Sequence, residues 1–204
     1  MNRIVLENKE IFPSKVVCIG RNYMEHIKEL NNEVPEDMVF FIKPNSAISS
    51  KLVFPKNQNS CHYEAEISFL IEDSKITAVA FGLDLTLREV QSKLKEKQLP
   101  WERAKAFDGA AVFSKFVSFD GDISKLGIEL YINGELRQKG DISMMINKPF
   151  EIINEARTFL SFEDGDIFMS GTPKGVGSFK IGDVFVGKIL YDGKVLIEET
   201  FTVN

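Results

Sequence analysis

The pattern of apolar and polar residues along the chain predicts mainly β-strands. Short apolar runs, some of them alternating with polar residues, recur between clusters rich in Gly, Pro, Asn and Asp, and such runs are typical of strands. In one of them Ile128, Leu130 and Ile132 occupy every second position, so they would share one face of a strand. The predicted strands are residues 15–19, 38–43, 65–71, 76–83, 126–132, 166–169 and 183–190.

Two dipeptides predict hairpin turns between these strands. Asn133-Gly134 follows the run that ends at Ile132, and Asp192-Gly193 stands before the last strand-like run. Asn-Gly and Asp-Gly pairs accept the positive φ angles that a two-residue hairpin turn needs. We therefore expect an antiparallel pair of strands at each place.

Helical signals are few, and the strongest begins at residue 86. The motif Thr86-Leu-Arg-Glu89 matches a capping box, in which two side chains satisfy free backbone amides at the start of a helix. Leu87, Val90 and Leu94 follow with the spacing of a buried helical stripe. We expect a helix here with that stripe packed against the core.

Two further helices are predicted between strands. One follows Pro149, because proline favours the first turn of a helix, and Phe150, Ile153 and Phe159 would face inward. A shorter one is expected over residues 23–30. Since the helices occur singly among more numerous strands, we expect a β-rich α+β fold with a few short helices, not alternating βαβ units.

Length and charge limit the class of protein. At 204 residues the chain fits a single domain, residues 1–204, and a chain of this size buries roughly 70% of its unfolded surface. A net charge of −5 argues against a nucleic-acid partner, because phosphate binding needs a basic face. No apolar run approaches the ~18–20 residues of a membrane span, so we expect no membrane partner.

The cysteines and the opening residues suit a cytoplasmic protein. Cys18 and Cys61 lack the spacing of a metal or redox motif, and both lie beside apolar residues. We expect them to be reduced and partly buried, as is usual in the cytoplasm. The opening residues also lack the apolar stretch of a signal peptide.

Three carboxylates on neighbouring predicted strands are the most informative chemical feature. Glu64 and Glu66 are two positions apart, so they would point to the same side of a strand, and Asp84 closes the next apolar run. Such an all-oxygen site suits Mg²⁺ or Mn²⁺ better than zinc. Two alternatives stay open. The carboxylates could face solvent, or His62 could join them as a fourth ligand and favour zinc or iron.

Basic and amide side chains follow the third carboxylate. Arg88 and Gln91 are three positions apart, so they would share one face of the predicted helix close to Asp84. The free amides and dipole of a helix start also favour anionic ligands. Lys105 then returns to this region after a turn. The order of these residues is consistent with a pocket for an anionic ligand beside a metal.

A second candidate group is formed by His26 and Glu29. The two residues are three positions apart in the predicted short helix, so their side chains can meet. A carboxylate beside an imidazole fixes its tautomer and favours its charged form, which is what a general base requires. His-x-x-Glu is nonetheless common on exposed helices.

These residues and several motifs together resemble the fumarylacetoacetate hydrolase family, above all its small acylpyruvase and oxaloacetate decarboxylase-like members. The further motifs are Ile19-Gly-Arg-Asn-Tyr23, Ile42-Lys-Pro-Asn45 and Ser170-Gly-Thr-Pro-Lys-Gly-Val-Gly177. The resemblance runs from about Ser14 to Gly187, and the motifs agree in order and spacing. It implies a mixed β-sandwich or roll of the family's C-terminal domain type, with residues 1 to about 13 peripheral.

The resemblance also implies roles for these residues. Glu64, Glu66 and Asp84 match the metal ligands, usually for Mg²⁺ or Mn²⁺. His26 and Glu29 match a catalytic dyad on a mobile lid. Residues matching the substrate pocket are Arg88, Gln91, Lys105 and Thr172, and Arg21 and Lys43 are expected either to touch the substrate or to be structural charge partners. A homodimer is implied as well, and the 17 phenylalanines would serve either the core or such an interface.

The implied chemistry is that of small 2-oxo acids, through a metal-stabilised pyruvate enolate. One expected reaction is C–C bond hydrolysis of 3-acylpyruvates, in which His26 and Glu29 would activate water. The other is decarboxylation of oxaloacetate, and in both Lys105 would add positive charge where the enolate forms. The alternatives are isomerisation, decarboxylation or tautomerisation of related 2-oxo dicarboxylates, such as 2-hydroxyhepta-2,4-diene-1,7-dioate, and a non-catalytic protein that binds the metal and an oxo acid.

Overall fold

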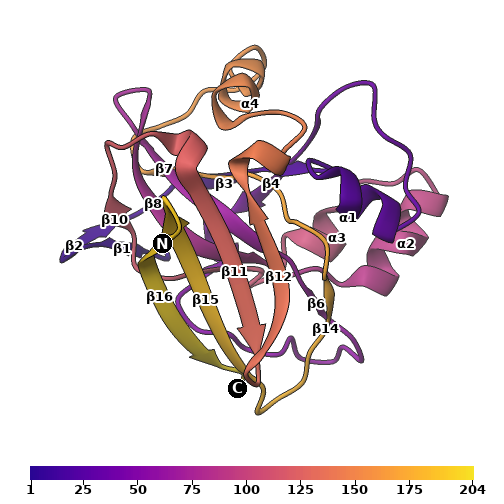
Figure 1. Ribbon diagram of the computed structural model, residues 1–204. Helices are drawn as coiled ribbons and strands as arrows, with labels where there is room; N and C mark the ends of the chain where they lie inside the picture. Colours follow the sequence, from indigo (N-terminus) through magenta and orange to yellow (C-terminus); the bar gives the residue numbers. More distant parts are fainter.

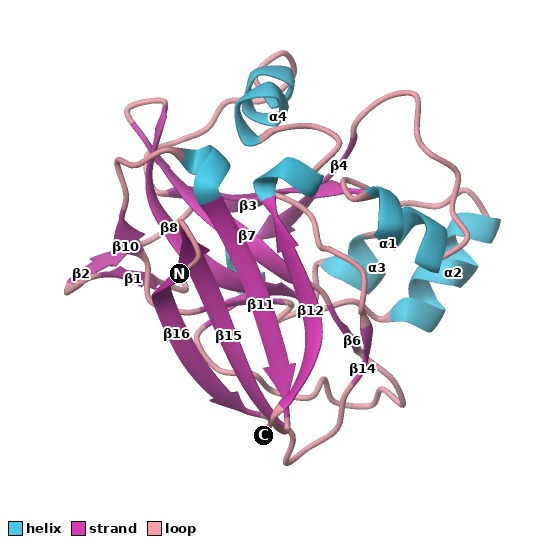
Figure 2. Ribbon diagram, in the orientation of Figure 1, coloured by secondary structure: helices cyan, strands magenta, loops and turns pink.

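A computed structural model of the protein describes residues 1–204, and most of its elements are strands (Figures 1 and 2). The eight strands of the larger sheet are β3 (Lys15–Gly20), β4 (Val39–Pro44), β5 (Ile48–Ser49), β7 (Ala65–Glu72), β8 (Lys75–Asp84), β9 (Ala111–Phe113), β10 (Val117–Ser118) and β13 (Asp166–Met169). The smaller sheet contains β11 (Leu126–Ile132), β12 (Glu135–Asp141), β15 (Val184–Tyr191) and β16 (Lys194–Thr202). Two short pairs, β1 (Ile4–Leu6) with β2 (Lys9–Ile11) and β6 (His62–Tyr63) with β14 (Gly177–Ser178), complete the strands.

Strand order makes the larger sheet mixed and the smaller one antiparallel. The larger sheet runs β4-β3-β13-β7-β8-β9-β5, with β10 paired to β8, and its β3–β13 and β5–β9 pairs are parallel. The smaller sheet runs β12-β11-β15-β16. In Figure 1 the smaller sheet lies across the face of the larger one, which is the mixed β-sandwich that the family resemblance implied.

The main hydrophobic core fills the space between the two sheets. Phe69 and Phe81 from the larger sheet and Ile128 from the smaller one are fully buried there. At Gly187 the sheets approach so closely that a Cβ would lie 2.4 Å from the Phe81 ring, so the position has room only for glycine.

A second core covers the opposite face of the larger sheet. Cys18 and Leu70 are buried there beneath Ile4 and Ile11 of the β1–β2 hairpin. β7 is therefore covered on both faces, and its residues from Ala65 to Ile71 are all buried, including the polar Glu66 and Ser68.

The predicted strands and turns are confirmed by the structure. Each predicted strand exists, with bounds within one residue of those expected, and residues 126–132 form β11 as predicted. Asn133 and Gly134 have φ angles of 52° and 83°, and Asp192 and Gly193 have 50° and 73°. Both dipeptides connect antiparallel neighbours, as the turn chemistry required.

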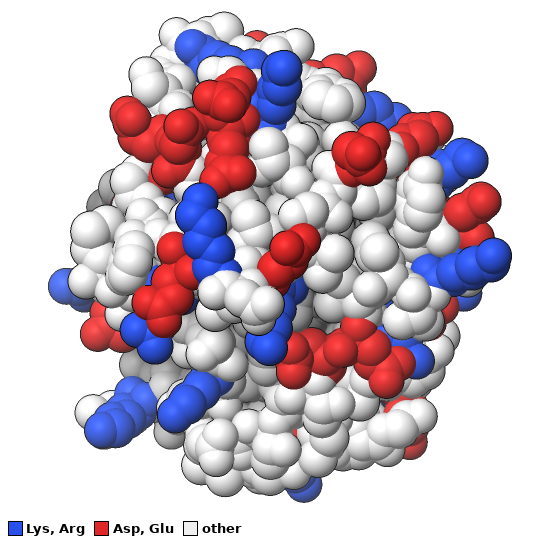
Figure 3. Space-filling model, turned by 90° about the vertical axis from the view of Figure 1, so that its left-hand side faces the viewer, with Lys and Arg blue, Asp and Glu red and all other residues white.

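The helices are α1 (Met24–Glu29), α2 (Arg88–Glu96), α3 (Glu102–Lys105) and α4 (Pro149–Ala156), and single 3₁₀ turns cover Asn45–Ala47, Ile123–Lys125 and Ile142–Met144. The first three α-helices gather beside one end of the sheets (Figure 2). None of the helices is long and apolar enough to span a bilayer. On the face shown in Figure 3, Lys and Arg side chains alternate with Asp and Glu, without a basic stripe.

Two details of the helix predictions are wrong. The capping box is absent, because α2 starts at Arg88 and Leu87 occupies the cap position. Thr86 instead pairs through its backbone with His62, and its hydroxyl accepts a hydrogen bond from Lys105. The predicted apolar stripe of α2 does pack on the core.

The inward face of α4 also differs from the prediction. Ile153 is buried as expected, together with Ile152. Phe150 and Phe159 are both 59% exposed, because one points outward from the first turn and the other lies beyond the helix end. The Phe159 ring instead packs edge-on against Phe40, at a centroid distance of 5.2 Å.

Candidate active site

Strands β7 and β8 bring the three predicted carboxylates together. Glu64 directly precedes β7, Glu66 is its second residue, and Asp84 is the last residue of β8. In the antiparallel ladder the amide of Asp84 donates to the carbonyl of Glu64 at 2.8 Å. One oxygen from each side chain lies within 4.8 Å of the other two, and all three residues are buried. The alternative of a solvent-facing carboxylate set is therefore wrong.

Three cationic side chains surround this cluster. Lys105 donates to Glu64 Oε2 at 2.8 Å and to Asp84 Oδ2 at 2.6 Å, reaching in from the last turn of α3. Arg88, the first residue of α2, pairs with the other oxygen of Glu64 and donates to Gln91 Oε1 at 2.7 Å. Lys43 Nζ lies 2.8 Å from Asp84 Oδ1 on the buried side of the cluster.

The charges of the cluster are divided unevenly. Burial alone would raise the pKa of Glu64, but Lys105 and Arg88 hold that pKa well below its ordinary value. Burial, followed by repulsion from Asp84 and Glu64, raises the pKa of Glu66 well above its ordinary value. The only protein donor to the Glu66 carboxylate is the amide of Gly171, at 2.8 Å. The acidic oxygens thus outnumber the donors that reach them.

This arrangement fits a bound divalent cation. All the candidate metal-ligand atoms are carboxylate oxygens, which hard ions such as Mg²⁺ and Mn²⁺ prefer. Asp84 Oδ1 is buried, and the one cation close to it, Lys43, directs its hydrogen bonds to the carbonyls of Leu85 and Lys105. His62 stands outside the cluster and is half-buried beside Arg88, so it does not extend the donor set toward zinc.

The predicted dyad forms at the start of the chain. His26 and Glu29 lie on α1, and His26 Nδ1 is 3.2 Å from Glu29 Oε2. The second oxygen of Glu29 accepts from the amide of Gly175 at 2.9 Å. Gly175 has φ +102°, and a Cβ there would lie 1.9 Å from the Arg137 carbonyl oxygen, so this anchor of α1 requires glycine.

A small cavity of about 30 Å³ is lined by His26 of the dyad and by Glu64 of the carboxylate cluster, whereas Glu29, Glu66 and Asp84 do not line it. It is lined by six of the predicted site residues: Arg21, His26, Glu64, Arg88, Gln91 and Lys105. Phe41, Lys95 and Trp101 line it too and were not predicted. Lys95 could have been found in the sequence, because it continues the face of Arg88 and Gln91 at helical spacing.

Thr172 and Lys43 do not line this cavity, but both contact the strands that carry the carboxylates. Thr172 donates to the carbonyl of Ala65, between the two glutamates, at 2.9 Å and accepts from Gln138 Nε2 at 2.8 Å. Gln138 Oε1 in turn accepts from the amide of Ala65 at 2.9 Å. These hydrogen bonds among Gln138, Thr172 and the Ala65 backbone form a closed ring, which we call the Gln138 ring. It fixes the backbone that carries Glu64 and Glu66.

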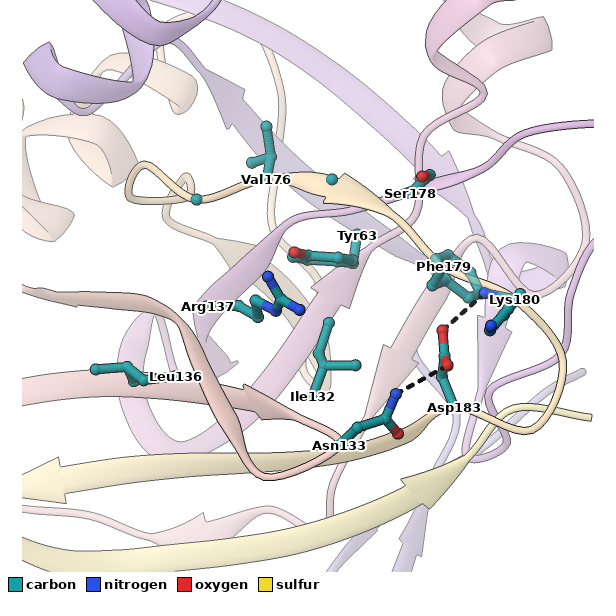
Figure 4. Close-up of a pocket in the computed structure, with 12 residues that line it drawn as sticks. Tyr63, Ile132, Asn133, Leu136, Arg137, Val176, Ser178, Phe179, Lys180 and Asp183 are labelled. Atoms are coloured by element: carbon teal, nitrogen blue, oxygen red, sulfur yellow. Dashed lines mark hydrogen bonds between the residues drawn. The ribbon is translucent and has the colours of Figure 1, made fainter.

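A larger hollow of about 700 Å³ opens elsewhere, between β14 and the β11–β12 hairpin (Figure 4). Tyr63, Arg137 and Lys180 line it, and its single carboxylate, Asp183, is already satisfied by Asn133 Nδ2 at 3.0 Å and by the Lys180 amide at 2.9 Å. The chemical groups therefore converge on the smaller cavity and not on the larger one.

Comparison with known proteins defines the class. Residues 15–200 match the fumarylacetoacetate (FAA) hydrolase C-terminal family. The chain belongs to this family, as the motifs in the sequence indicated.

Individual relatives are similar over nearly the whole chain. Oxaloacetate tautomerase YcgM of Escherichia coli is 40% identical over 200 residues, which cover 90% of each chain. Human mitochondrial oxaloacetate tautomerase FAHD1 is 37% identical over 185 residues, covering 82% of this chain and 83% of the relative. The crystal structure of fumarylpyruvate hydrolase from Pseudomonas aeruginosa in complex with Mn²⁺ and pyruvate superposes with a TM-score of 0.90 at 28% identity, covering 99% of this chain and 95% of that one.

Proposed function

We propose that the protein is a divalent-metal-dependent enzyme that interconverts the keto and enol forms of oxaloacetate or a close 2-oxo acid. The observation that carries the proposal is the buried cluster of Glu64, Glu66 and Asp84 with too few donors of its own. The similarity to oxaloacetate tautomerases favours tautomerisation, which the sequence analysis named as an alternative, over the C–C bond cleavage that the family resemblance put first.

Glu64, Glu66 and Asp84 would hold the ion, either Mg²⁺ or Mn²⁺. When bound, such an ion withdraws electrons from the C2 carbonyl of a 2-oxo acid and so stabilises the negative charge of an enolate. Lys105 adds a fixed positive charge beside Glu64 and Asp84, in a buried site where electrostatic stabilisation is strong.

His26 would move the proton. Its Nδ1 faces Glu29, so the neutral ring carries its hydrogen on Nδ1 and leaves Nε2 free as a base. In the proposed reaction Nε2 takes a proton from C3 of the keto acid, and the proton then passes to the C2 oxygen to give the enol. Glu29 stabilises the imidazolium in between and is itself held by the Gly175 amide.

The direct test follows the ultraviolet absorbance of enol oxaloacetate as it decays to the keto form. We expect the protein to accelerate this decay in Mg²⁺ or Mn²⁺, to lose the effect in a chelator, and to regain it when metal is restored. Pyruvate release is measured in parallel to detect decarboxylation. An unchanged enol decay with metal present would refute the proposal.

A second candidate reaction is hydrolysis of 3-acylpyruvates, favoured by the His26–Glu29 pair, of which His26 lines the cavity, and by the fold shared with a fumarylpyruvate hydrolase. In that reaction the pair would activate water instead of removing a C3 proton. His26→Ala should then lower the hydrolysis of acetylpyruvate by roughly 10²–10⁴-fold. An unchanged rate in that variant would remove His26 from the mechanism. An activity screen with oxaloacetate, acetylpyruvate, fumarylpyruvate and a heptadienedioate separates tautomerisation and hydrolysis from isomerisation. A protein that only binds oxo acids would turn over none of them.

A further inference from the structure

Two cations at the candidate cavity have no acidic partner. Arg21 and Lys95 both line it and are half-buried, yet neither forms an ion pair. The Arg21 side chain makes one long contact, 3.4 Å from Nη1 to the Glu33 carbonyl, and its buried Nε has no partner. By contrast, Lys105 and Arg88 are already engaged by Glu64. The uncommitted positive charge of the cavity is therefore carried by Arg21 and Lys95.

Helix α2 places Lys95 further from the carboxylate cluster than Arg88, on the same face of the helix. Arg88, Gln91 and Lys95 occupy successive turns of one helical face, and all three line the cavity. Arg88 contacts Glu64, whereas Lys95 lies seven positions further, about 10 Å along the helix axis. A ligand bound at the cluster would therefore have to extend toward Lys95 to meet it.

An aromatic wall connects the inner and outer cations. The Lys105 ammonium lies 4.9 Å from the centre of the Phe41 ring, and the Lys95 ammonium lies 5.0 Å from that of Trp101. The two rings are neighbours, with centroids 6.1 Å apart. Such cation–π contacts hold an ammonium in place without neutralising it, so Lys95 keeps its charge for a ligand.

The surroundings of Lys95 also favour an anion. Burial, followed by repulsion from Arg21 and Arg88, lowers the pKa of Lys95 to about 8. An incoming carboxylate would relieve that repulsion and gain a charge-assisted hydrogen bond.

We propose that Lys95, together with Arg21, binds the second carboxylate of a dicarboxylic 2-oxo acid, the one remote from its C2 carbonyl. The proposal rests on the proposed function for the identity of the substrate. It makes Lys95 a residue that selects dicarboxylic substrates such as oxaloacetate over oxo acids with an uncharged tail.

The kinetic test compares oxaloacetate with its 4-methyl ester, which lacks only the remote charge. Lys95→Met should lower kcat/KM for oxaloacetate by about 10-fold, mainly through KM, and change the value for the ester by less than about 3-fold. Lys95→Arg should restore most of the loss. Lys93→Met is the matched control, because Lys93 is an exposed lysine of the same helix that does not line the cavity. Equal losses for both substrates, or no loss, would overturn the proposal.

A binding test separates this proposal from the proposed function. Oxamate and N-oxalylglycine share the same oxalyl head, and only the second carries a remote carboxylate. Calorimetry on the Mg²⁺-loaded protein should give tighter binding of N-oxalylglycine, and Lys95→Met should remove that advantage. If the protein does not tautomerise oxaloacetate, the proposed function fails, and this comparison still decides on the subsite. An advantage that persists in Lys95→Met, or equal affinities in the unmodified protein, would contradict it.

Discussion

Two buried carboxylates in this protein, Asp166 and Glu66, have opposite surroundings. Asp166, at the start of β13, accepts hydrogen bonds from the Ser14 amide at 3.0 Å, its hydroxyl at 2.7 Å, the Lys15 amide at 3.1 Å and the Glu163 amide at 2.9 Å, and it pairs with the Lys15 ammonium. Burial would raise its pKa, but these donors hold the pKa below its ordinary value. Asp166 is thus satisfied entirely from within the chain.

Glu66 presents the contrary case. It receives one backbone donor, from Gly171, and faces the carboxylates of Asp84 and Glu64. The comparison teaches that burial of a carboxylate does not by itself distinguish structure from function. The supply of donors does, because a buried anion without them needs a cation from outside the chain.

Replacing Glu66 should have the largest effect on activity. Glu66→Gln keeps the shape but removes a ligand charge, so we expect at least about a 10³-fold loss in tautomerisation of oxaloacetate at saturating Mg²⁺. Since the change also removes repulsion within the cluster, the metal-free variant should unfold at the same temperature as the unmodified protein or above it. Activity within tenfold of the unmodified protein would contradict the assignment of Glu66 as a metal ligand, and with it the contrast to Asp166.

Disrupting the Gln138 ring should have an intermediate effect on activity. Gln138→Leu removes the hydrogen bonds to Thr172 and to the Ala65 amide that position the glutamate backbone. Groups that orient metal ligands typically contribute 10–100-fold, so we expect a loss of about that size in activity and in metal affinity. Gln138→Glu keeps the acceptor for Ala65 and should lose less. A fully active, well-folded Gln138→Leu variant would show that the ring has no positioning role.

Asp166→Asn should change activity least and stability most. The new amide nitrogen would face hydrogen-bond donors in place of an accepting oxygen. We therefore expect a loss of about 2–3 kcal/mol in unfolding free energy at pH 7, with activity within about 3-fold of the unmodified protein. Because the folded pKa of Asp166 lies below the unfolded one, its contribution is present above about pH 4 and is lost as pH falls through the folded pKa. Thermal unfolding should therefore show a gap between variant and unmodified protein that narrows in acid. A gap that is constant with pH would contradict this assignment.

Much of the fold was predictable because the strands carry local signals. The apolar runs of β7 and β8 and the turn at Asn133 and Gly134 specify their conformation through nearby residues alone. The failures occurred where distant contacts override a local motif. Thr86 matches a capping position, but the bridge to His62 and the bond from Lys105 keep it extended.

The residues of the candidate site also differ in how far the sequence predicts their position. Glu64, Glu66 and Asp84 could be predicted to meet, because side-chain alternation and strand pairing place them on one face. Gln138 and Trp101 could not, since their positions depend on which elements pack around β7 and α2. Phe150 and Phe159 were placed inward because apolarity alone does not show which face of a helix meets the core.

The central claim is that the cluster of Glu64, Glu66 and Asp84 binds a divalent cation whereas Asp166 does not. It is tested most directly by calorimetric titration of Mn²⁺ into the metal-free protein and into the Glu66→Gln and Asp166→Asn variants. We predict that the unmodified protein and Asp166→Asn bind Mn²⁺ with equal affinity and that Glu66→Gln binds at least about 100-fold more weakly. Equal binding by Glu66→Gln, or no binding by the unmodified protein, would contradict the claim.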